Sequence, residues 1–210
     1  MRIPAATIFV VDDDTAVRSA LSRLIRSAGW TVQALASPHE FLQLAPKTGI
    51  GCLVLDVHMP DMTGPELHDR MIKAGISLPV IYLTGRGDVI TGVSAMKKGA
   101  IDYLLKPVDD DVLLQAIDRA IEKCAFKSIH DDEREGVLAH YGLLSPRERE
   151  VLLQVLKGRL NKQIALELGI AEKTVKVHRG RVMEKMQVRS VAELVHICEV
   201  AGISKSAFPP

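Results

Sequence analysis

Five short apolar runs recur every 20-odd residues in the first half of the chain, and this spacing limits the folds that it can form. The runs are TIFVV from Thr7, WTVQAL from Trp30, CLVL from Cys52, PVIYL from Pro79 and AIDYLL from Ala100. Their length is typical of buried strands, while the intervals carry helical patterns such as the apolar face of residues 16–28. Strands that alternate with helices favour an α/β fold, a doubly wound parallel sheet with helices on both faces. No strand pattern follows Leu105, so we expect a second, all-helical part.

The composition is that of an ordinary globular protein, with 25% charged and 47% hydrophobic residues among 210. No apolar run approaches the roughly 18 residues that span a bilayer. The start MRIPAATIFV lacks the pattern of a signal peptide. Cys52, Cys124 and Cys198 are far apart and odd in number, which indicates reduced cysteines rather than disulfides or metal ligands. We therefore expect a cytoplasmic protein with no membrane partner.

Polar side chains follow four of the five predicted strands. In a doubly wound sheet the functional crevice lies outside the carboxyl ends of the strands. The residues that would meet on this rim are Asp12, Asp13, Asp14, Asp56, Thr84 and Lys106. Crowded carboxylates suit a hard cation such as Mg²⁺, which takes one or two protein carboxylates and keeps several waters that a phosphate can displace. A lysine and a threonine can contact phosphate oxygens, and an aspartate can accept a phosphoryl group.

Plainer interpretations exist for each of these signals taken alone. Aspartates are favoured at helix starts, so the three consecutive carboxylates could be an ordinary cap. A phosphatase of the haloacid-dehalogenase type also has Asp-x-Asp-x-Thr after a strand, and Asp12 and Asp14 fit that pattern. Ala16 stands where the threonine is needed, and the later acidic pair is missing. The ordered set of four strand ends favours a phosphoryl-acceptor site over both alternatives.

Residues 5–122 resemble the receiver domain of response regulators, since VDDD, LDVHMPDMTG, LTG and the Lys-Pro step occur in that family's order and spacing. The resemblance implies a five-stranded sheet of order 2-1-3-4-5, as in CheY and flavodoxin, and a cis Lys106–Pro107 bond. It implies that Asp56 accepts the phosphoryl group and that Thr84 and Lys106 contact its oxygens. Tyr103 would be the switching aromatic. The implied Mg²⁺ ligands are Asp12, Asp13, Asp56 and the backbone carbonyl of His58. Such a domain accepts a phosphoryl group and slowly hydrolyses it, so we expect no turnover enzyme.

The chain changes character after the last predicted strand. A helical pattern begins at Asp110 and continues into the polar IHDDEREG, and we expect residues 123–141 to form a helical linker. Helical runs follow at 147–157, 161–168 and 172–186, and a fourth begins at RSVAEL. LSPRERE contains a capping box of Ser145 and Glu148. Residues 141–210 carry 12 Lys and Arg against 7 Asp and Glu, which indicates a polyanionic partner.

The motifs LSPREREVL, NKQIA, TVKVH and AELVH resemble the four-helix DNA-binding domain of the NarL/LuxR/FixJ type, over residues 142–204. In this helix-turn-helix arrangement the second helix enters the major groove. A basic helix face can also be merely solvated, but its place on the second helix favours DNA contact. The resemblance and the basic face together give the candidate DNA-binding residues Lys173, Thr174, Lys176, Val177, Arg179 and Arg181. Ala171 stands where the family often has a capping Ser or Thr, whose loss costs about 1 kcal/mol.

The two parts together resemble a two-component response regulator, nearest to the FixJ-like branch. A sensor histidine kinase would phosphorylate Asp56, two receivers would then pair, and the dimer would bind a two-fold promoter site and regulate transcription, with activation as the expected outcome. RNA polymerase is a further candidate partner. The candidate dimer face consists of Ile90, Val93, Met96 and Lys97. The alternative is a constitutive DNA-binding regulator whose receiver serves only as a dimerisation module; a LuxR-type sensor of small molecules is disfavoured.

Overall fold

The computed structural model describes residues 6–44, 49–85 and 89–203; side chains 89–91 lie outside this description. The chain divides into two compact units, residues 1–128 and 129–210, and each is considered separately. The boundary between them falls within one long helix, α5 (Asp110–Gly142).

The first unit is a five-stranded parallel sheet of order β2-β1-β3-β4-β5, which confirms the predicted fold class. The strands are β1 (Thr7–Val11), β2 (Thr31–Leu35), β3 (Gly51–Asp56), β4 (Val80–Thr84) and β5 (Asp102–Leu105). Every residue of β3 and β4 is buried, as expected for central strands of a parallel sheet with both faces covered. The register pairs Val11 with Leu55, Asp56 with Leu83 and Thr84 with Leu105, so the strand ends meet at one edge.

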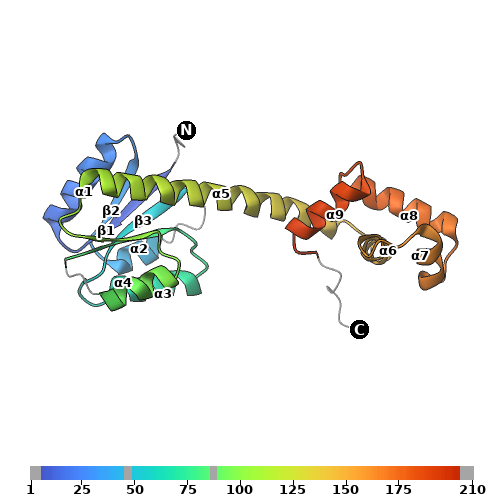
Figure 1. Cartoon of the computed structure of the whole chain (residues 1–210), viewed down its shortest axis with the longest axis horizontal. Coiled ribbons are helices and arrows are strands. Elements are labelled where there is room, and N and C mark those ends of the chain that lie inside the picture. Colours follow the sequence, from blue (N-terminus) through green and yellow to red (C-terminus); the bar gives the residue numbers. More distant parts are fainter. Residues whose placement is uncertain (1–5, 45–48, 86–88, 204–210) are drawn as a thin grey trace. The chain divides into compact units, whose positions relative to one another are not determined.

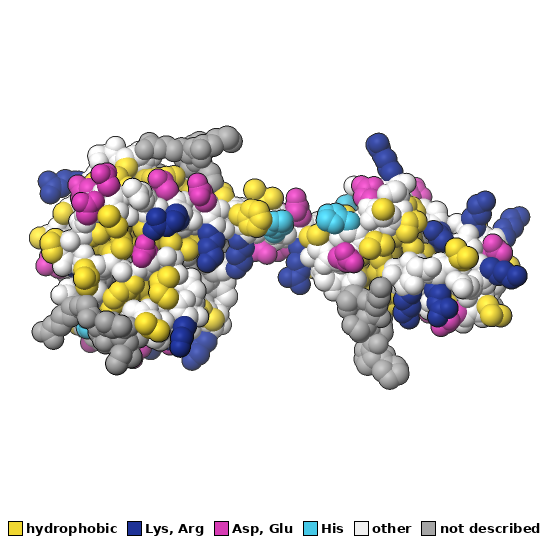
Figure 2. Space-filling view, viewed as in Figure 1, with side chains coloured by type: hydrophobic (Ala, Val, Ile, Leu, Met, Phe, Trp, Pro, Cys, Tyr) yellow, Lys and Arg dark blue, Asp and Glu magenta, His cyan; other side chains and the backbone are white. Residues whose placement is uncertain are grey.

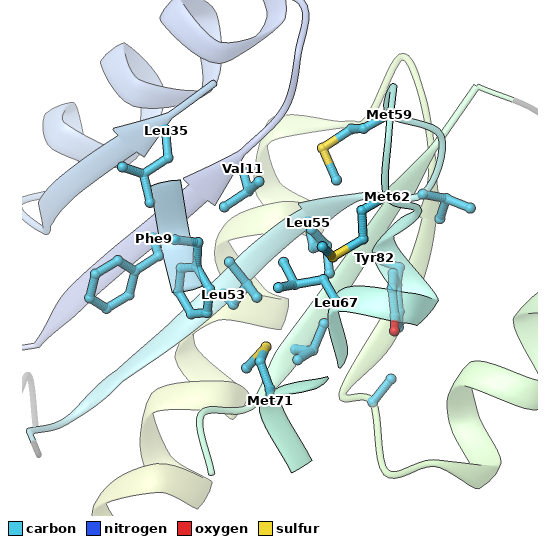
Figure 3. Packing of buried hydrophobic residues seen from close by; sticks show 14 of the residues in the cluster. Phe9, Val11, Leu35, Leu53, Leu55, Met59, Met62, Leu67, Met71 and Tyr82 are labelled. Atoms are coloured by element: carbon cyan, nitrogen blue, oxygen red, sulfur yellow. The ribbon is translucent and has the colours of Figure 1, made fainter. Parts of the chain in front are cut away.

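Helices cover both faces of this sheet (Figure 1). Helix α1 (Thr15–Ser27) and the first part of α5 pack on one face, around Ile25, Val54 and Ile117. Helices α2 (Pro38–Leu44), α3 (Gly64–Lys73) and α4 (Val89–Lys97) lie on the other. Figure 3 shows this second core, in which β-strand side chains such as Leu53, Leu55 and Tyr82 meet Leu67 and Met71 of α3. The two cores fix the strands in register and thereby fix the positions of the strand ends.

The second unit consists of helices packed around one apolar core. They are α6 (Pro146–Leu156), α7 (Asn161–Leu168), α8 (Glu172–Lys185) and α9 (Val191–Val200). Ser145 and Glu148 form the predicted capping box at the start of α6. Gly169 ends α7 with φ of 64°, a left-handed conformation that glycine adopts without strain and that permits the sharp turn into α8.

Residues 123–141, the expected linker, lie within α5. Val137 and Tyr141 near its C-terminal end pack against the core of the second unit, and Arg134 Nε donates to the Ala201 carbonyl at 3.4 Å. The domain limits inferred from the sequence stay predictions. None of the helices in the described ranges is both long and apolar enough to span a membrane.

Candidate functional site

Two buried carboxylates share one lysine at the carboxyl ends of the strands. Lys106 Nζ lies 2.6 Å from Asp12 Oδ2 and 2.8 Å from Asp56 Oδ1. Asp12 follows β1, Asp56 ends β3 and Lys106 follows β5, so three strand ends supply the cluster. Asp12 is 1% exposed and Asp56 is 5% exposed. Carboxylates this deeply buried require a counter-charge, and Lys106 provides it for both.

Burial and pairing act in opposite directions on this cluster. Burial raises the pKa of Asp56, and the hydrogen bond from Lys106 opposes that rise. Burial alone would lower the pKa of Lys106, but its hydrogen bonds to Asp12 and Asp56 outweigh this effect and raise it. Lys106 is therefore held as a cation between the two acids at neutral pH.

The other predicted rim residues occupy distinct positions. Thr84 is fully buried at the end of β4, and the His58 backbone N–H donates to Asp56 Oδ2 at 3.2 Å. Asp14 caps α1, because its Oδ1 accepts from the N–H groups of Ala16 and Val17 at 2.7 and 3.2 Å. Asp13 is exposed. The Lys106–Pro107 bond is cis, as the family resemblance implied.

The donor set fits a hard divalent cation. A pocket of about 430 Å³ lies over the cluster, lined by Asp56, His58, Gly85 and Lys106. Mg²⁺ needs only one or two protein carboxylates and completes its shell with water, so Asp12 and Asp56 suffice as anionic ligands. Among the described residues no three His, Cys, Asp or Glu side chains converge at one point, so Asp13 does not join the pair. A cation at this position would compete with Lys106 for the two carboxylates.

Tyr103 lies in β5 with its ring against the neighbouring strand. Its ring centroid is 6.1 Å from that of Tyr82, the residue paired with it in the register. Tyr82 is fully buried and its hydroxyl lies 3.0 Å from His68 Nδ1, also buried. Burial lowers the pKa of His68, so this histidine is neutral in the folded protein near neutral pH. Sequence patterns gave no sign of this polar pair inside an apolar core.

The candidate dimer face on α4 is apolar and open to solvent. Val93 is 51% exposed and Met96 is 48% exposed, and Lys97 beside them is exposed too. The side chain of Ile90 lies outside the described residues. Val93 and Met96 are therefore not part of the core of this unit.

Helix α8 has a buried face and a charged face. Val175 and Val182 pack into the core. The exposed residues on the helix include Lys173, Thr174, Lys176, Val177 and Arg181. Figure 2 shows Lys and Arg side chains projecting from this unit. An exposed basic helix of this kind supplies phosphate contacts along a DNA backbone.

Two hydrogen bonds that the sequence did not reveal hold the helix-turn-helix. Arg179 Nη1 donates to Asn161 Oδ1 at 2.7 Å and thereby links α8 to the start of α7. Arg147 Nη2 donates to the Leu168 carbonyl at 2.6 Å and links α6 to the end of α7. Arg179 is half-buried, so it is positioned by Asn161 rather than free in solvent. The only sequence signal for Asn161 was its place at the start of the NKQIA motif.

Comparison with known proteins matches two families to this chain. Residues 8–118 match the response regulator receiver domain, and residues 142–198 match the bacterial regulatory proteins of the luxR family. The fold and the strand-end cluster therefore define a response regulator, and the chain belongs to that family. Its combination of a receiver with a LuxR-type DNA-binding domain is that of the NarL/FixJ type, as the sequence motifs predicted.

Relatives cover nearly the whole chain. Response regulator protein TmoT of Ectopseudomonas mendocina is 43% identical over 92% of this chain and 88% of its own length. Transcriptional regulatory protein FixJ of Rhizobium meliloti is 40% identical over 95% of this chain and 98% of its own. The solved structure of response regulator StyR has a TM-score of 0.84 and 42% identity, covering 93% of this chain and 98% of that one. Proteins of this family are transcription factors rather than turnover enzymes; sensor kinases phosphorylate them, they bind promoter DNA, and receiver domains generally bind Mg²⁺.

Proposed function

We propose that Asp56 is the phosphoacceptor of this response regulator and that its phosphorylation promotes dimerisation and sequence-specific DNA binding. The observation that carries the proposal is the Lys106 bridge between Asp12 and Asp56, at 2.6 and 2.8 Å. This bridge places a cation where a phosphoryl group on Asp56 would need one. A structural ion pair would require only one carboxylate.

The transfer from a sensor histidine kinase exchanges one bond to phosphorus for another. A carboxylate oxygen of Asp56 forms the new P–O bond, the P–N bond to the kinase histidine breaks, and the imidazole leaves with the electron pair. Bound Mg²⁺ would neutralise charge on the phosphoryl oxygens. Asp12, Asp13, Asp56 and the His58 carbonyl are the proposed ligands, Asp13 after its exposed side chain turns inward. Lys106 and Thr84 would then hold the phosphoryl oxygens.

The signal would leave the site through β4 and β5. Thr84 ends β4 and Tyr103 lies in β5, and β5 contacts α4. Movement of Thr84 toward the phosphoryl group would let the Tyr103 ring change its position. The ring would in turn change the surface that α4 presents. We propose that two receivers pair through Ile90, Val93, Met96 and Lys97. A complete switch between states requires a bias of about 5.5 kcal/mol.

The paired helical units would bind a two-fold promoter site in the cytoplasm. Lys176 and Val177 are proposed to reach base edges, while Lys173, Thr174, Arg179 and Arg181 contact the backbone. Phosphate contacts supply affinity that falls with salt, and base contacts supply specificity. Activation of transcription, with RNA polymerase as partner, is the proposed outcome.

The test is the mass in solution by light scattering, with Mg²⁺, in the presence and absence of beryllofluoride as a phosphoryl mimic. Wild type should shift from monomer to dimer, and Asp56→Ala should stay monomeric. Asp118→Ala, an exposed acid on α5, is the matched control and should behave as wild type. A DNA titration under the same conditions should show tighter binding only where the dimer forms. Dimers of Asp56→Ala that still bind DNA fully would support the alternative, a constitutive DNA-binding regulator with a receiver used only for dimerisation.

A further inference from the structure

One glycine in α4 faces the ring of Tyr103 at a distance that leaves no ordinary space for a side chain. A Cβ built on Gly92 would lie 3.3 Å from Tyr103 Cδ1 and 3.4 Å from Cε1. Such a contact requires the ring to move by a few tenths of an ångström. A glycine inside a helix lowers helix stability relative to alanine, and Gly92 has no positive φ that would require it. The lack of a side chain at Gly92 therefore serves to let the Tyr103 ring approach α4 closely.

The tyrosine ring is enclosed on more than one side. Tyr82 lies beside it, with the two centroids 6.1 Å apart, and Tyr82 is itself fixed by the contact of its hydroxyl with His68. Figure 3 shows the Tyr82 side chain among the buried side chains of this core. Because Tyr82 is fully buried and its hydroxyl contacts His68, the packed core opposes its displacement by Tyr103. The Tyr103 ring can therefore change position more readily on the side that faces Gly92.

The packed position of the Tyr103 ring is unfavourable for its hydroxyl group. Its oxygen is buried and forms no hydrogen bond with any residue that the structure describes. A buried hydroxyl without a partner weakens the packed position relative to one in which the hydroxyl meets water. The ring is thus held by packing against Gly92 and Tyr82 and opposed by its own polar tip. Small changes at residue 92 should therefore change where the ring lies.

We propose that Gly92 is a positioning residue for Tyr103: the absent side chain leaves the space in which the ring rests against α4, and the size of residue 92 sets how often the ring is there. The packing relationship stands on contacts alone, while its importance for signalling rests on the proposed phosphorylation of Asp56. Through Tyr103, Gly92 would set how strongly the phosphoryl site is coupled to the α4 surface.

The first test follows the ring directly, in the full chain labelled with fluorotyrosine. The chain has three tyrosines, so the Tyr103 resonance is identified by its loss in Tyr103→Phe. Gly92→Ala and Gly92→Leu should move this resonance progressively toward the solvent-exposed value, as measured by the H₂O/D₂O isotope shift. Gly136→Ala and Gly136→Leu are matched controls, because Gly136 is also helical and a Cβ there meets nothing within 4 Å. An unchanged Tyr103 resonance in Gly92→Leu would overturn the proposal.

The second test separates an effect through Tyr103 from an effect on the α4 surface. The beryllofluoride concentration that produces half-maximal dimerisation should rise about tenfold in Gly92→Leu, within the usual range of coupling between sites. In a Tyr103→Ala background the same substitution should change it by less than about twofold, because the ring is gone. An equal change in both backgrounds would show that residue 92 acts at the surface and would overturn the positioning role. If wild type itself does not dimerise, the function proposed for Asp56 fails, and the fluorine measurement still decides the packing relationship.

Discussion

Lys185 Nζ lies 2.7 Å from Glu148 Oε2, and this pair joins the end of α8 to the first turn of α6. Glu148 is 2% exposed and also accepts from the Ser145 backbone N–H at 2.8 Å. One carboxylate therefore completes a helix cap and anchors the proposed DNA-reading helix. Burial alone would raise the pKa of Glu148, but the bonds from Lys185 and Ser145 outweigh it and lower the pKa to about 2.

Glu148→Gln should destabilise the helical unit by about 1–3 kcal/mol at pH 7, since a buried cap and a charge-assisted hydrogen bond are weakened together. A depressed carboxyl pKa adds stability that is fully present above the unfolded value of 4.5 and lost as the pH falls toward 2. Urea unfolding from pH 7 to pH 2 should therefore show wild type converging on the variant. Glu150→Gln, at an exposed position on the same helix, is the control. A constant gap between wild type and Glu148→Gln at all pH values would contradict the assignment.

Lys106→Met should destabilise the receiver by about 3 kcal/mol without Mg²⁺, because two buried carboxylates lose their shared cation. Added Mg²⁺ should recover part of the loss and should bind the variant more tightly than wild type, in which Lys106 competes for the same carboxylates. The measurement is urea unfolding across a Mg²⁺ titration. Lys97→Met, on the exposed face of α4, should change neither quantity. Weaker Mg²⁺ binding by Lys106→Met would show that the lysine does not compete with the cation.

Arg179→Ala and Asn161→Ala should weaken DNA binding in different ways. Removal of the Arg179 charge should lower both affinity and the salt dependence, by about one unit of the log–log slope. Asn161→Ala keeps the charge but releases the 2.7 Å contact that orients it, so affinity should fall with the slope unchanged. Fluorescence anisotropy with promoter DNA at several salt concentrations measures both. Equal slopes for wild type and Arg179→Ala would mean that this arginine has no phosphate contact.

Ala171→Ser should stabilise the helical unit by about 1 kcal/mol. Ala171 precedes α8 with φ of −69° and ψ of 144°, the extended geometry of a capping residue, but its methyl group cannot accept a hydrogen bond. A serine hydroxyl there would accept from an N–H group of the first turn. Ala139→Ser, exposed and inside α5, serves as the comparison and should be neutral or slightly destabilising. The midpoint of thermal unfolding reports the difference, and no rise in Ala171→Ser would indicate that α8 is already capped by other means.

The fold was predictable because its signals are local. Apolar runs, capping residues and Gly169 each lie within a few positions of the feature that they determine. The approach of Asp12, Asp56 and Lys106 was also accessible, since the carboxyl ends of parallel strands meet at one edge. The features of the site that the sequence could not reveal are those that depend on the direction in which a side chain points. Asp13 is exposed rather than joined to the cluster, and only the geometry shows that Lys106 spans both remaining acids.

Side-chain contacts between separate helices and strands were equally impossible to predict from sequence patterns. The Tyr82–His68 pair has a sequence separation of 14, and each residue taken alone looks like an ordinary strand or helix position. Gly92 carried no sequence signal, and its role became visible only from the Tyr103 ring that packs against it from β5. Asn161 and Arg179 lie in separate helices whose crossing decides whether they meet. Contacts of this kind depend on how the whole core packs rather than on the spacing of residues along the sequence.

Of the three consecutive aspartates after β1, Asp12 contacts Lys106 and Asp14 caps α1. These two roles limit how the chain can change in length there. Asp12 accepts from the Asp14 backbone N–H at 2.9 Å, and its carbonyl accepts from Arg18 of α1 at 2.7 Å, while Asp14 caps α1. Loss or gain of one residue between Asp12 and Asp14 would put the wrong carboxylate oxygen at the α1 cap or at Lys106. The fold of this unit should therefore tolerate substitution at Asp13 far better than any insertion or deletion in the motif.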